Sequence, residues 1–420
     1  MPDERPTSDF SQQRRWILPF VLHVSVFVAF IDRINLSLAL PELAEYYGWS
    51  ERETGDRGSV LMGAFFLAYA ISNICLSGMA AKWGLRKSLI ALVIAFSVFT
   101  ALGAPLSFSL PLFVVTRILL GLGEGVHFPV MSGLMKNWFP LHERSRANAI
   151  WIFGGNLAIV LAPVLLVPIV DRLGWQAMLV VCGTLGMLVT LPLLSRFAFD
   201  APRDAPLMER QQVEYIEANV EESVANSADW NFLRWPVFWL AALGAIANNF
   251  CIWAILSWLP TYFVKARGLD FSDLNFAASL PYVAGFLGFT LSALLGDHTN
   301  RRIAIAALGF FGASASVLCV TYAASIPLTI AAFSAGTFFQ SAYVSQEYAI
   351  VQRILPANII GQAAGIYTGL SVLFGALGGT VLLGQIVSFT GSFDLGLYSV
   401  VAVAALGACI MAILSRLVRY

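Results

Sequence analysis

The sequence predicts an all-α integral membrane protein with about twelve spanning helices, and three observations lead to this fold class. Hydrophobic residues make up 58% of the 420-residue chain and charged residues only 12%, against about 25% charged residues in ordinary soluble domains. Apolar runs of roughly 20 residues, long enough to cross a bilayer as helices, recur along the chain. One extended polar stretch separates these runs into two groups of six.

Each apolar run defines one expected helix. The first group lies at residues 16–40, 59–81, 88–107, 111–135, 145–170 and 175–198. The second lies at residues 236–262, 275–296, 302–323, 327–351, 360–388 and 393–415. We therefore expect a tail at 1–15, a six-helix bundle at 16–199, a linker at 200–235, a second six-helix bundle at 236–415 and a tail at 416–420. A short helix is expected in the middle of the linker, after its prolines.

The distribution of cations predicts the orientation of these helices in the membrane. Most Lys and Arg residues lie on the side of the two termini and the linker, which the positive-inside rule assigns to the cytoplasm. The first apolar run is longer than the hydrophobic core of a signal peptide and is interpreted as a helix that is retained. We expect a multi-pass protein of the cell inner membrane, with both termini cytoplasmic.

The remaining composition argues against several other classes of protein. The formal net charge is zero, and nothing in the sequence supports nucleic-acid binding. The five cysteines are scattered through the apolar runs, and the four histidines form no metal-spaced cluster. The sequence lacks hydrolase, kinase and metalloenzyme signatures. We therefore expect no enzymatic activity, no cofactor and no metal ion.

Five charged residues inside the apolar runs are the strongest functional signal. They are Asp32, Arg33, Arg117, Glu124 and Glu347. A charge at the centre of a membrane helix costs roughly 2.5–3.5 kcal/mol on insertion scales, so it is expected to pair or to face a watery cavity. A guanidinium suits an anion because its planar fork can hold a carboxylate or sulfonate through two bonds. Two acids beside two arginines predict a path for an anion and a proton.

Helical geometry constrains how these side chains point. Arg117 and Glu124 are seven residues apart, which is two helical turns and nearly the same face. His127 shares roughly that face, where it either satisfies the backbone or helps a proton to move. Asp32 and Arg33 are consecutive, so their side chains diverge by about 100 degrees. One of them can face a ligand while the other faces a neighbouring helix.

Several motifs resemble a known group of proteins over nearly the whole chain. They are FIDRINLS, FFLAYAISN running into SGMAAKWGLRK, TRILLGLGEGVHFP and WFPLHERSRANAI. Together they are similar to the major facilitator superfamily and, within it, to the anion:cation symporter family. The resemblance implies two six-helix bundles, a monomer, and uptake of small organic anions, carboxylates or sulfonates, usually with protons. Repeated halves with a site between them are the usual construction of such carriers.

The resemblance also implies roles for individual residues. Arg33 and Arg117 would meet the anion, and Asp32 and Glu124 occupy positions implicated in protonation. The positions expected to line the binding pocket are Tyr69, Asn156, Ser345 and Tyr348. Gating roles are expected for Lys82, Arg86, Asp297, Glu347 and Arg353. Glu347 either forms a local bridge, for instance with Arg353, or faces the cavity.

The sequence departs from the family pattern at three positions. Ser77 and Ala81 stand where the loop motif usually has Gly and Asp. In relatives this loop holds the cytoplasmic side closed by charge pairing, so the closure expected for this half is weaker. Ala376 stands where the family often has an Asn that binds hydroxyl groups. This difference favours a small anion with few hydroxyl groups.

The seventh and tenth helices are expected to form the wall of the binding pocket that belongs to the second bundle. Asn249 and Trp253 share a helical face, whereas Trp258 and Tyr262 near the helix end are interpreted as anchors at the membrane interface. Gln340 is one of several residues that make the tenth helix unusually polar.

A competition between acid and anion for the arginines is the mechanism that these residues suggest. In the empty site the arginines would be neutralised by Asp32 and Glu124, and protonation of an acid would free an arginine for the anion. The expected function is therefore proton-coupled uptake of a small organic anion by alternating access. An exchanger, an exporter and a receptor that binds an anion without moving it are alternatives. A further alternative is that the charges only form salt bridges between two helices.

Overall fold

The computed structural model describes residues 14–206, 208–220, 230–355 and 360–418, and within these ranges its regular elements are all helices. The first half contains α1 (Ile17–Tyr46), α2 (Glu51–Trp83), α3 (Leu85–Leu106), α4 (Leu110–Glu124), α5 (His127–Trp138), α6 (Leu141–Leu173), α7 (Trp175–Leu185) and α8 (Leu191–Phe197). The linker contains α9 (Arg210–Asn219). The second half contains α10 (Pro236–Thr261), α11 (Leu274–Thr299), α12 (Arg302–Tyr322), α13 (Ile326–Ile354), α14 (Ile360–Leu370), α15 (Leu377–Thr390) and α16 (Phe393–Leu417).

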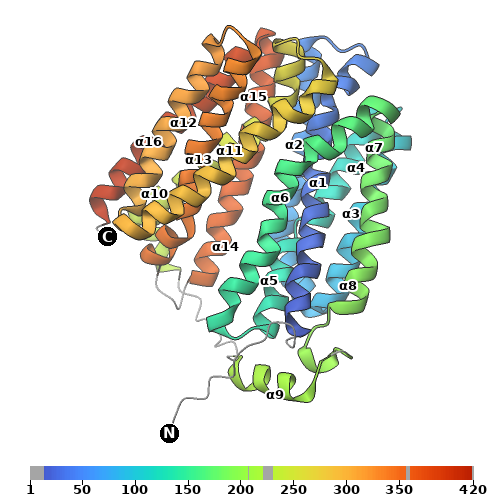
Figure 1. The fold of residues 1–420 in the computed structure, drawn as a ribbon, viewed down its shortest axis with the longest axis vertical. Coiled ribbons are helices and arrows are strands. Elements are labelled where there is room, and N and C mark those ends of the chain that lie inside the picture. The colour runs from blue at the N-terminus through green and yellow to red at the C-terminus, as the bar shows by residue number, and fades with distance from the viewer. Residues whose placement is uncertain (1–13, 207, 221–229, 356–359, 419–420) are drawn as a thin grey trace.

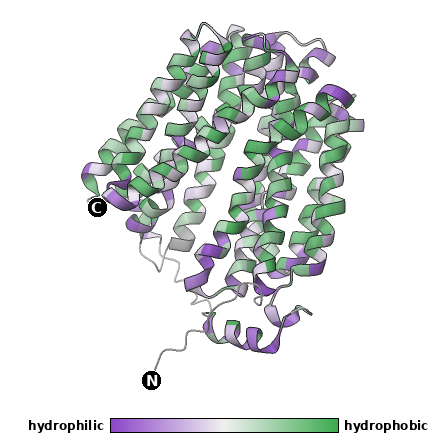
Figure 2. Ribbon diagram, in the orientation of Figure 1, coloured by the Kyte–Doolittle hydropathy of each residue, from purple (hydrophilic) through white to green (hydrophobic). Residues whose placement is uncertain are grey.

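The helices form two bundles that stand side by side, with α9 beneath the first bundle (Figure 1). Hydrophobic residues cover the long helices, and hydrophilic residues gather at the helix ends and on α9 (Figure 2). Eleven helical segments of the described chain are long and apolar enough to cross a membrane. The remaining long helix, α13, has 29 residues and packs within the second bundle. The all-α membrane fold expected from composition is thus confirmed, and α9 is the helix expected in the linker.

Several spans are interrupted rather than continuous. The fourth span divides after Glu124, where α4 ends and α5 begins at His127. Its backbone carbonyls near the break are satisfied by α2: Ser72 Oγ donates to Leu122 O at 2.6 Å, and Asn73 Nδ2 donates to Gly125 O at 2.9 Å. In a membrane such bonds replace those that water would otherwise make. Three further spans contain a π-helical turn, at Gly186–Thr190, Tyr262–Ala266 and Ser371–Ala376.

The two bundles meet closely at the end of the molecule opposite α9. There α2 lies against α15, and a Cβ atom added at Gly55 would lie 2.6 Å from the backbone oxygen of Gly384. Gln385 of α15 donates to Ser59 Oγ at 2.8 Å and to Asp56 Oδ1 at 3.2 Å across the same contact. The glycines therefore allow backbone to approach backbone, and we call this contact the α2–α15 seam.

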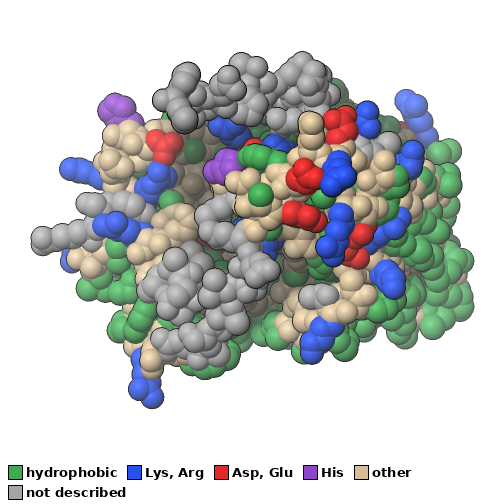
Figure 3. Space-filling view, turned by 90° about the horizontal axis from the view of Figure 1, so that it is seen from below, with side chains coloured by type: hydrophobic (Ala, Val, Ile, Leu, Met, Phe, Trp, Pro, Cys, Tyr) green, Lys and Arg blue, Asp and Glu red, His purple; other side chains and the backbone are tan. Residues whose placement is uncertain are grey.

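The opposite end of the molecule carries charged groups of both signs (Figure 3). Here the guanidinium of Arg15 lies 4.9 Å from the ring centroid of Tyr215 in α9, and the Tyr215 hydroxyl lies 3.4 Å from His142 Nε2. Arg15 also pairs with Glu143 at 3.0 Å. Tyr215 thus connects the linker helix to the first bundle.

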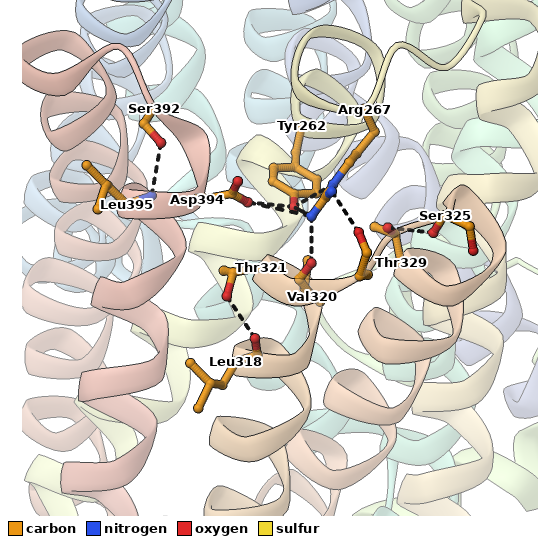
Figure 4. Close-up of polar contacts among 11 residues, drawn as sticks. Tyr262, Arg267, Leu318, Val320, Thr321, Ser325, Thr329, Ser392, Asp394 and Leu395 are labelled. Carbon is orange, nitrogen blue, oxygen red and sulfur yellow. Dashed lines mark hydrogen bonds and ion pairs between the residues drawn. The ribbon is translucent and has the colours of Figure 1, made fainter.

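A cluster at the seam end of the second bundle ties three helices together (Figure 4). Tyr262 donates to Asp394 at 2.8 Å and accepts from Arg267 Nη2 at 2.6 Å. Arg267 also donates to the carbonyl oxygens of Val320 at 2.6 Å and Ala323 at 2.9 Å, at the end of α12. We call this the Arg267 clasp.

The interpretation of Trp258 and Tyr262 as interface anchors is wrong. Both side chains are buried, with 1% and 2% of their surfaces exposed. Trp258 donates its indole N–H to Thr380 O at 2.8 Å, and Tyr262 belongs to the Arg267 clasp. The aromatic-belt rule assumes a lipid-facing side chain, whereas these rings face the interior of the bundle.

Candidate functional site

The core of the first bundle contains a buried ion pair. Arg33 Nε of α1 donates to Glu124 Oε2 of α4 at 2.6 Å, with 6% and 0% of the two side chains exposed. Three aromatic rings surround the guanidinium, and their centroids lie 4.6 Å (Phe30), 4.7 Å (Tyr69) and 5.6 Å (Phe128) from its carbon. Aromatic faces attract a cation within about 6 Å, most strongly where water is excluded. The rings and the carboxylate therefore hold Arg33 in one place.

Asp32 and Arg117 lie in the same core, but no salt bridge joins them in the described structure. Both are buried, with 0% and 2% of their surfaces exposed. Asp32 Oδ1 accepts a hydrogen bond from Asn35 Nδ2 at 3.4 Å. Arg117 interacts electrostatically with Glu124 and Asp32 but forms no salt bridge in the part of the chain that the structure describes. Of the two arginines, Arg33 is thus the one that an acid neutralises directly.

Polar atoms without hydrogen-bond partners concentrate in this core. Asp32 Oδ2, Arg33 Nη2, Arg117 Nε, Glu124 Oε1 and His127 Nδ1 are all buried and unpartnered among the described residues. An unmade hydrogen bond to a buried group costs about 1–3 kcal/mol, and more if the group is charged. The carboxylate oxygens can take up a proton or bind a water without first breaking bonds to the protein. The guanidinium nitrogens can likewise donate to a water or an anion.

His127 continues this core beyond Glu124. Its Nε2 atom lies 2.8 Å from Ser25 Oγ of α1, and the imidazole is completely buried. One ring nitrogen is therefore occupied by a hydroxyl, and the other is the unpartnered Nδ1. A serine hydroxyl, rather than a backbone group, is therefore the hydrogen-bond partner of His127 Nε2.

A cavity of about 150 Å³ lies between the two bundles. The first bundle contributes α6 to its wall, and the second contributes α10, α11 and α13. The lining residues are Asn156, Ile159, Val160, Ile252, Ile255, Leu256, Tyr282, Gly285, Phe286, Phe289, Thr337, Gln340, Ser341 and Val344. The structure therefore places Asn156, one of the expected pocket residues, at the surface of the cavity.

The expected residues of the tenth helix lie elsewhere on α13. Ser345 Oγ donates to Ala342 O at 3.0 Å and accepts from Gln346 Nε2 at 2.8 Å. Tyr348 has 75% of its surface exposed. Glu347 accepts from Tyr367 of α14 at 2.9 Å, and the Tyr367 hydroxyl lies 3.0 Å from that of Tyr343. The Glu347 carboxylate therefore ends a hydrogen-bonded chain that runs through two tyrosine hydroxyl groups of the second bundle.

The expected gate residues fall into two separate groups. In the first bundle Lys82 is exposed, and Arg86 donates its Nη2 to Ser195 O at 2.7 Å. In the second bundle Asp297 pairs with Arg302, which also donates to Gln346 at 3.0 Å. Arg353 lies in the last turn of α13. The contacts described for Arg86 lie within the first bundle, and those described for Asp297 and Arg302 lie within the second.

Asp200 is a polar anchor that sequence reasoning missed. Its Oδ1 atom accepts from the backbone N–H of Arg86 at 2.7 Å, at the start of α3. Such a bond satisfies one of the open donors at a helix N-terminus. The side chain of Ala81, which replaces the usual motif acid, lies outside the described set. An acid directly after the sixth span was the available signal.

Comparisons with known proteins identify the family to which the sequence is similar. The profile of the Major Facilitator Superfamily matches residues 22–380. A probable sulfoacetate transporter from Cupriavidus necator is 30% identical over 89% of this chain and 88% of its own. A probable galactarate/D-glucarate transporter from Escherichia coli is 29% identical over 93% of this chain and 92% of its own.

Solved structures with low sequence identity share the fold. A D-xylose-proton symporter has a TM-score of 0.76 at 17% identity and covers 94% of this chain and 96% of its own. A bacterial homologue of the lysosomal transporter Spinster, in an inward-facing and occupied conformation, also has a TM-score of 0.76 at 17% identity. It covers 96% of this chain and 97% of its own.

Proposed function

We propose that this chain, which belongs to the major facilitator superfamily and within it to the anion:cation symporter family, takes up a small organic anion together with protons. Relatives named as transporters of organic anions place it among transport proteins and not among enzymes. The proposed cargo is a carboxylate or a sulfonate, the two anionic groups that a guanidinium binds through paired hydrogen bonds. The proposed location is the inner membrane, with the end that carries α9 in the cytoplasm.

The observation that carries the proposal is the buried pair of Arg33 and Glu124. While Glu124 is ionised, it occupies the guanidinium that an anion needs. Protonation of Glu124 removes that competitor, and an anionic headgroup can then take its place on Arg33. Proton and anion binding are thereby coupled, since each favours the other in equal measure.

The neighbouring charges fit the same cycle. Arg117 Nε has no hydrogen-bond partner among the described residues, so this side chain is available as a second contact for the headgroup. Asp32, also buried with one unpartnered oxygen, is the second proposed proton acceptor. With one proton bound per negative charge, the loaded site approaches neutrality, which lowers the cost of moving it through the membrane.

Alternating access requires the two ends of the pathway to open in turn. The α2–α15 seam closes the end opposite α9, through Gly55, Gly384 and the bonds of Gln385. We propose that this is the periplasmic end and that the seam opens to admit the anion. The gating roles of Lys82, Arg86, Asp297, Glu347 and Arg353 belong to the cytoplasmic end in this proposal.

The decisive experiment uses the full chain in reconstituted vesicles. A thermal-shift screen of the purified protein over carboxylates and sulfonates identifies an anion that stabilises it. Uptake of that anion is then measured with an inside-alkaline pH gradient, with and without a protonophore. Accumulation that the protonophore abolishes is the expected result. Flux that requires a counter-anion and ignores the pH gradient would indicate an exchanger, and binding without flux would indicate a receptor.

A further inference from the structure

The cavity between the bundles is lined mainly by apolar side chains, which restricts the chemistry of an anion that enters it. Eight of its fourteen lining residues are Ile, Val, Leu or Phe, and none is charged. The paired arginine and acid of the first bundle are absent from this lining. A ligand that reaches both places would bind its charged end to Arg33 and leave an uncharged portion in the cavity.

One buried polar atom of these lining residues lacks a hydrogen-bond partner in the described part of the chain. Gln340 of α13 is 4% exposed, and its Nε2 donates to Asn248 Oδ1 of α10 at 2.6 Å. This bond fixes the orientation of the amide and directs its other atom, Oε1, away from Asn248. Gln340 Oε1 is buried and has no hydrogen-bond partner among the described residues. Gln340 thus combines a place in the cavity lining with an acceptor whose orientation is fixed and whose hydrogen bond is unmade in the described structure.

The rest of the lining limits how many polar groups a ligand can have there. A hydroxyl that faces Ile159, Ile252 or Phe286 would lose its bonds to water and gain none. Thr337 donates its hydroxyl to Phe333 O at 3.1 Å and to the Pro281 carbonyl of its own bundle. Three further polar residues line the cavity, but the eight apolar side chains offer no partners to a chain of hydroxyl groups.

We propose that Gln340, held by Asn248, selects an anion whose uncharged end carries a single hydrogen-bond donor, a hydroxyl or an amide N–H, on a short hydrocarbon chain. The inference rests on the proposed function, because it assigns the charged end of the same anion to Arg33. Gln340 is then a specificity-determining residue that touches the substrate at the end remote from its charge.

Matched pairs of anions test the proposal with the purified full-length protein. Isethionate and ethanesulfonate differ by one terminal hydroxyl, as do 3-hydroxypropionate and propionate. Dissociation constants are measured by calorimetry, with galactonate as a polyhydroxylated comparison. Wild-type protein is expected to bind the hydroxylated member of a pair about tenfold more tightly, since a donor satisfies a buried acceptor. Galactonate is expected to bind more weakly than isethionate.

The variant Gln340→Met keeps the size of the side chain and removes the acceptor. It is expected to bind both members of a pair equally, whereas Gln352→Met, on an exposed position of the same helix, should keep the wild-type preference. Equal binding of both members by wild-type protein would overturn the proposal without recourse to any variant. An unchanged preference in Gln340→Met would overturn it as well, and so would tightest binding of galactonate.

Failure of the further inference can be told apart from failure of the proposed function. If other carboxylates or sulfonates bind and none of the four short anions does, the assigned substrate class is wrong and the proposed function stands. If no carboxylate or sulfonate in a broad screen binds or moves, the proposed function itself is wrong.

Discussion

The Nε atom of Arg33 lies 2.6 Å from Oε2 of Glu124, and this contact joins α1 to α4 in a core that excludes water. A buried pair of this kind contributes little net stability, but removal of one partner leaves an uncompensated charge that costs about 3–5 kcal/mol. The pair is thus stable as long as both charges are present or both are neutralised. That property suits a site where a proton and an anion arrive together.

The variant Glu124→Gln should uncouple transport from the proton gradient. The amide cannot release a proton, so Arg33 stays available to the anion at every pH. We expect accumulation driven by a pH gradient to fall about tenfold or more, the size of a typical coupling free energy, while exchange of labelled for unlabelled anion continues. The variant Glu53→Gln, at an exposed pair with Arg57, is the control. Wild-type pH dependence in Glu124→Gln would exclude the coupling role.

The variants Arg33→Lys and Arg117→Lys should weaken anion binding although they keep the charge. An ammonium cannot hold a carboxylate through a planar fork and fits the aromatic cage of Arg33 less well. Hydrogen bonds to charged groups are worth about 1.5–3 kcal/mol, so the dissociation constant should rise roughly tenfold or more. Arg57→Lys, on the surface, should bind like wild type. Equal affinity in Arg117→Lys would rule out a two-bond contact there.

Replacement of Gly55 by Leu should prevent closure of the α2–α15 seam. A Cβ atom alone would lie 2.6 Å from Gly384 O, so the added side chain forces the two helices apart. With the five native cysteines replaced by alanine, a cysteine at position 56 should react faster with an impermeant maleimide in Gly55→Leu than without it. Gly78→Ala, in open space on the same helix, serves as the control. Equal labelling rates would show that the seam does not depend on this glycine.

The variant Tyr262→Phe should destabilise the second bundle. It removes the hydroxyl that links Arg267 to Asp394 within the clasp. A single lost hydrogen bond costs about 1 kcal/mol, and more if a buried charged group is left unpaired. We expect a lower melting temperature in detergent. Tyr46→Phe, at a position with 66% of its surface exposed, should melt like wild type.

The variant Asp200→Ala should loosen the start of α3. The lost acceptor at Arg86 N leaves an open donor in the first helical turn, and loss of a helix cap costs about 1 kcal/mol. Amide hydrogen exchange should accelerate at Arg86 and its neighbours, with little change in the second bundle. Asp204→Ala, at an exposed linker position, tests whether any loss of linker charge has this effect. Unchanged exchange would show that Asp200 does not cap the helix.

Composition and spacing were sufficient to predict the helices and the charged core, but not the pairing within it. The intramembrane positions of Asp32, Arg33, Arg117 and Glu124 follow from the apolar runs around them. Which arginine meets Glu124 depends on the rotation of α1 relative to α4, and that rotation is set by packing over the whole bundle. The cage around Arg33 likewise combines rings from three helices, including Tyr69 of α2 and Phe128 of α5.

Contacts between distant segments explain the remaining differences from the sequence-based expectations. Asp200 reaches Arg86 across 114 positions of the chain, so its place directly after the sixth span marks the acid but not its partner. Gln340 was recognised as polar, whereas its free acceptor became visible only with Asn248 in place. Trp258 was assigned to the membrane interface because an aromatic residue near a helix end usually faces lipid.

In the proposed alternating-access cycle, the α2–α15 seam affects how the protein divides its time between its two states. Gly55 and Gly384 have no side chains to immobilise, so bringing them together costs no rotamer entropy. A closure built on glycine backbone, with Gln385 as its hydrogen-bonding side chain, can form and separate with little reorganisation of its surroundings. The preference for one state over the other would then depend on the end that carries α9. There, long charged side chains lose rotamer entropy each time the two bundles come together.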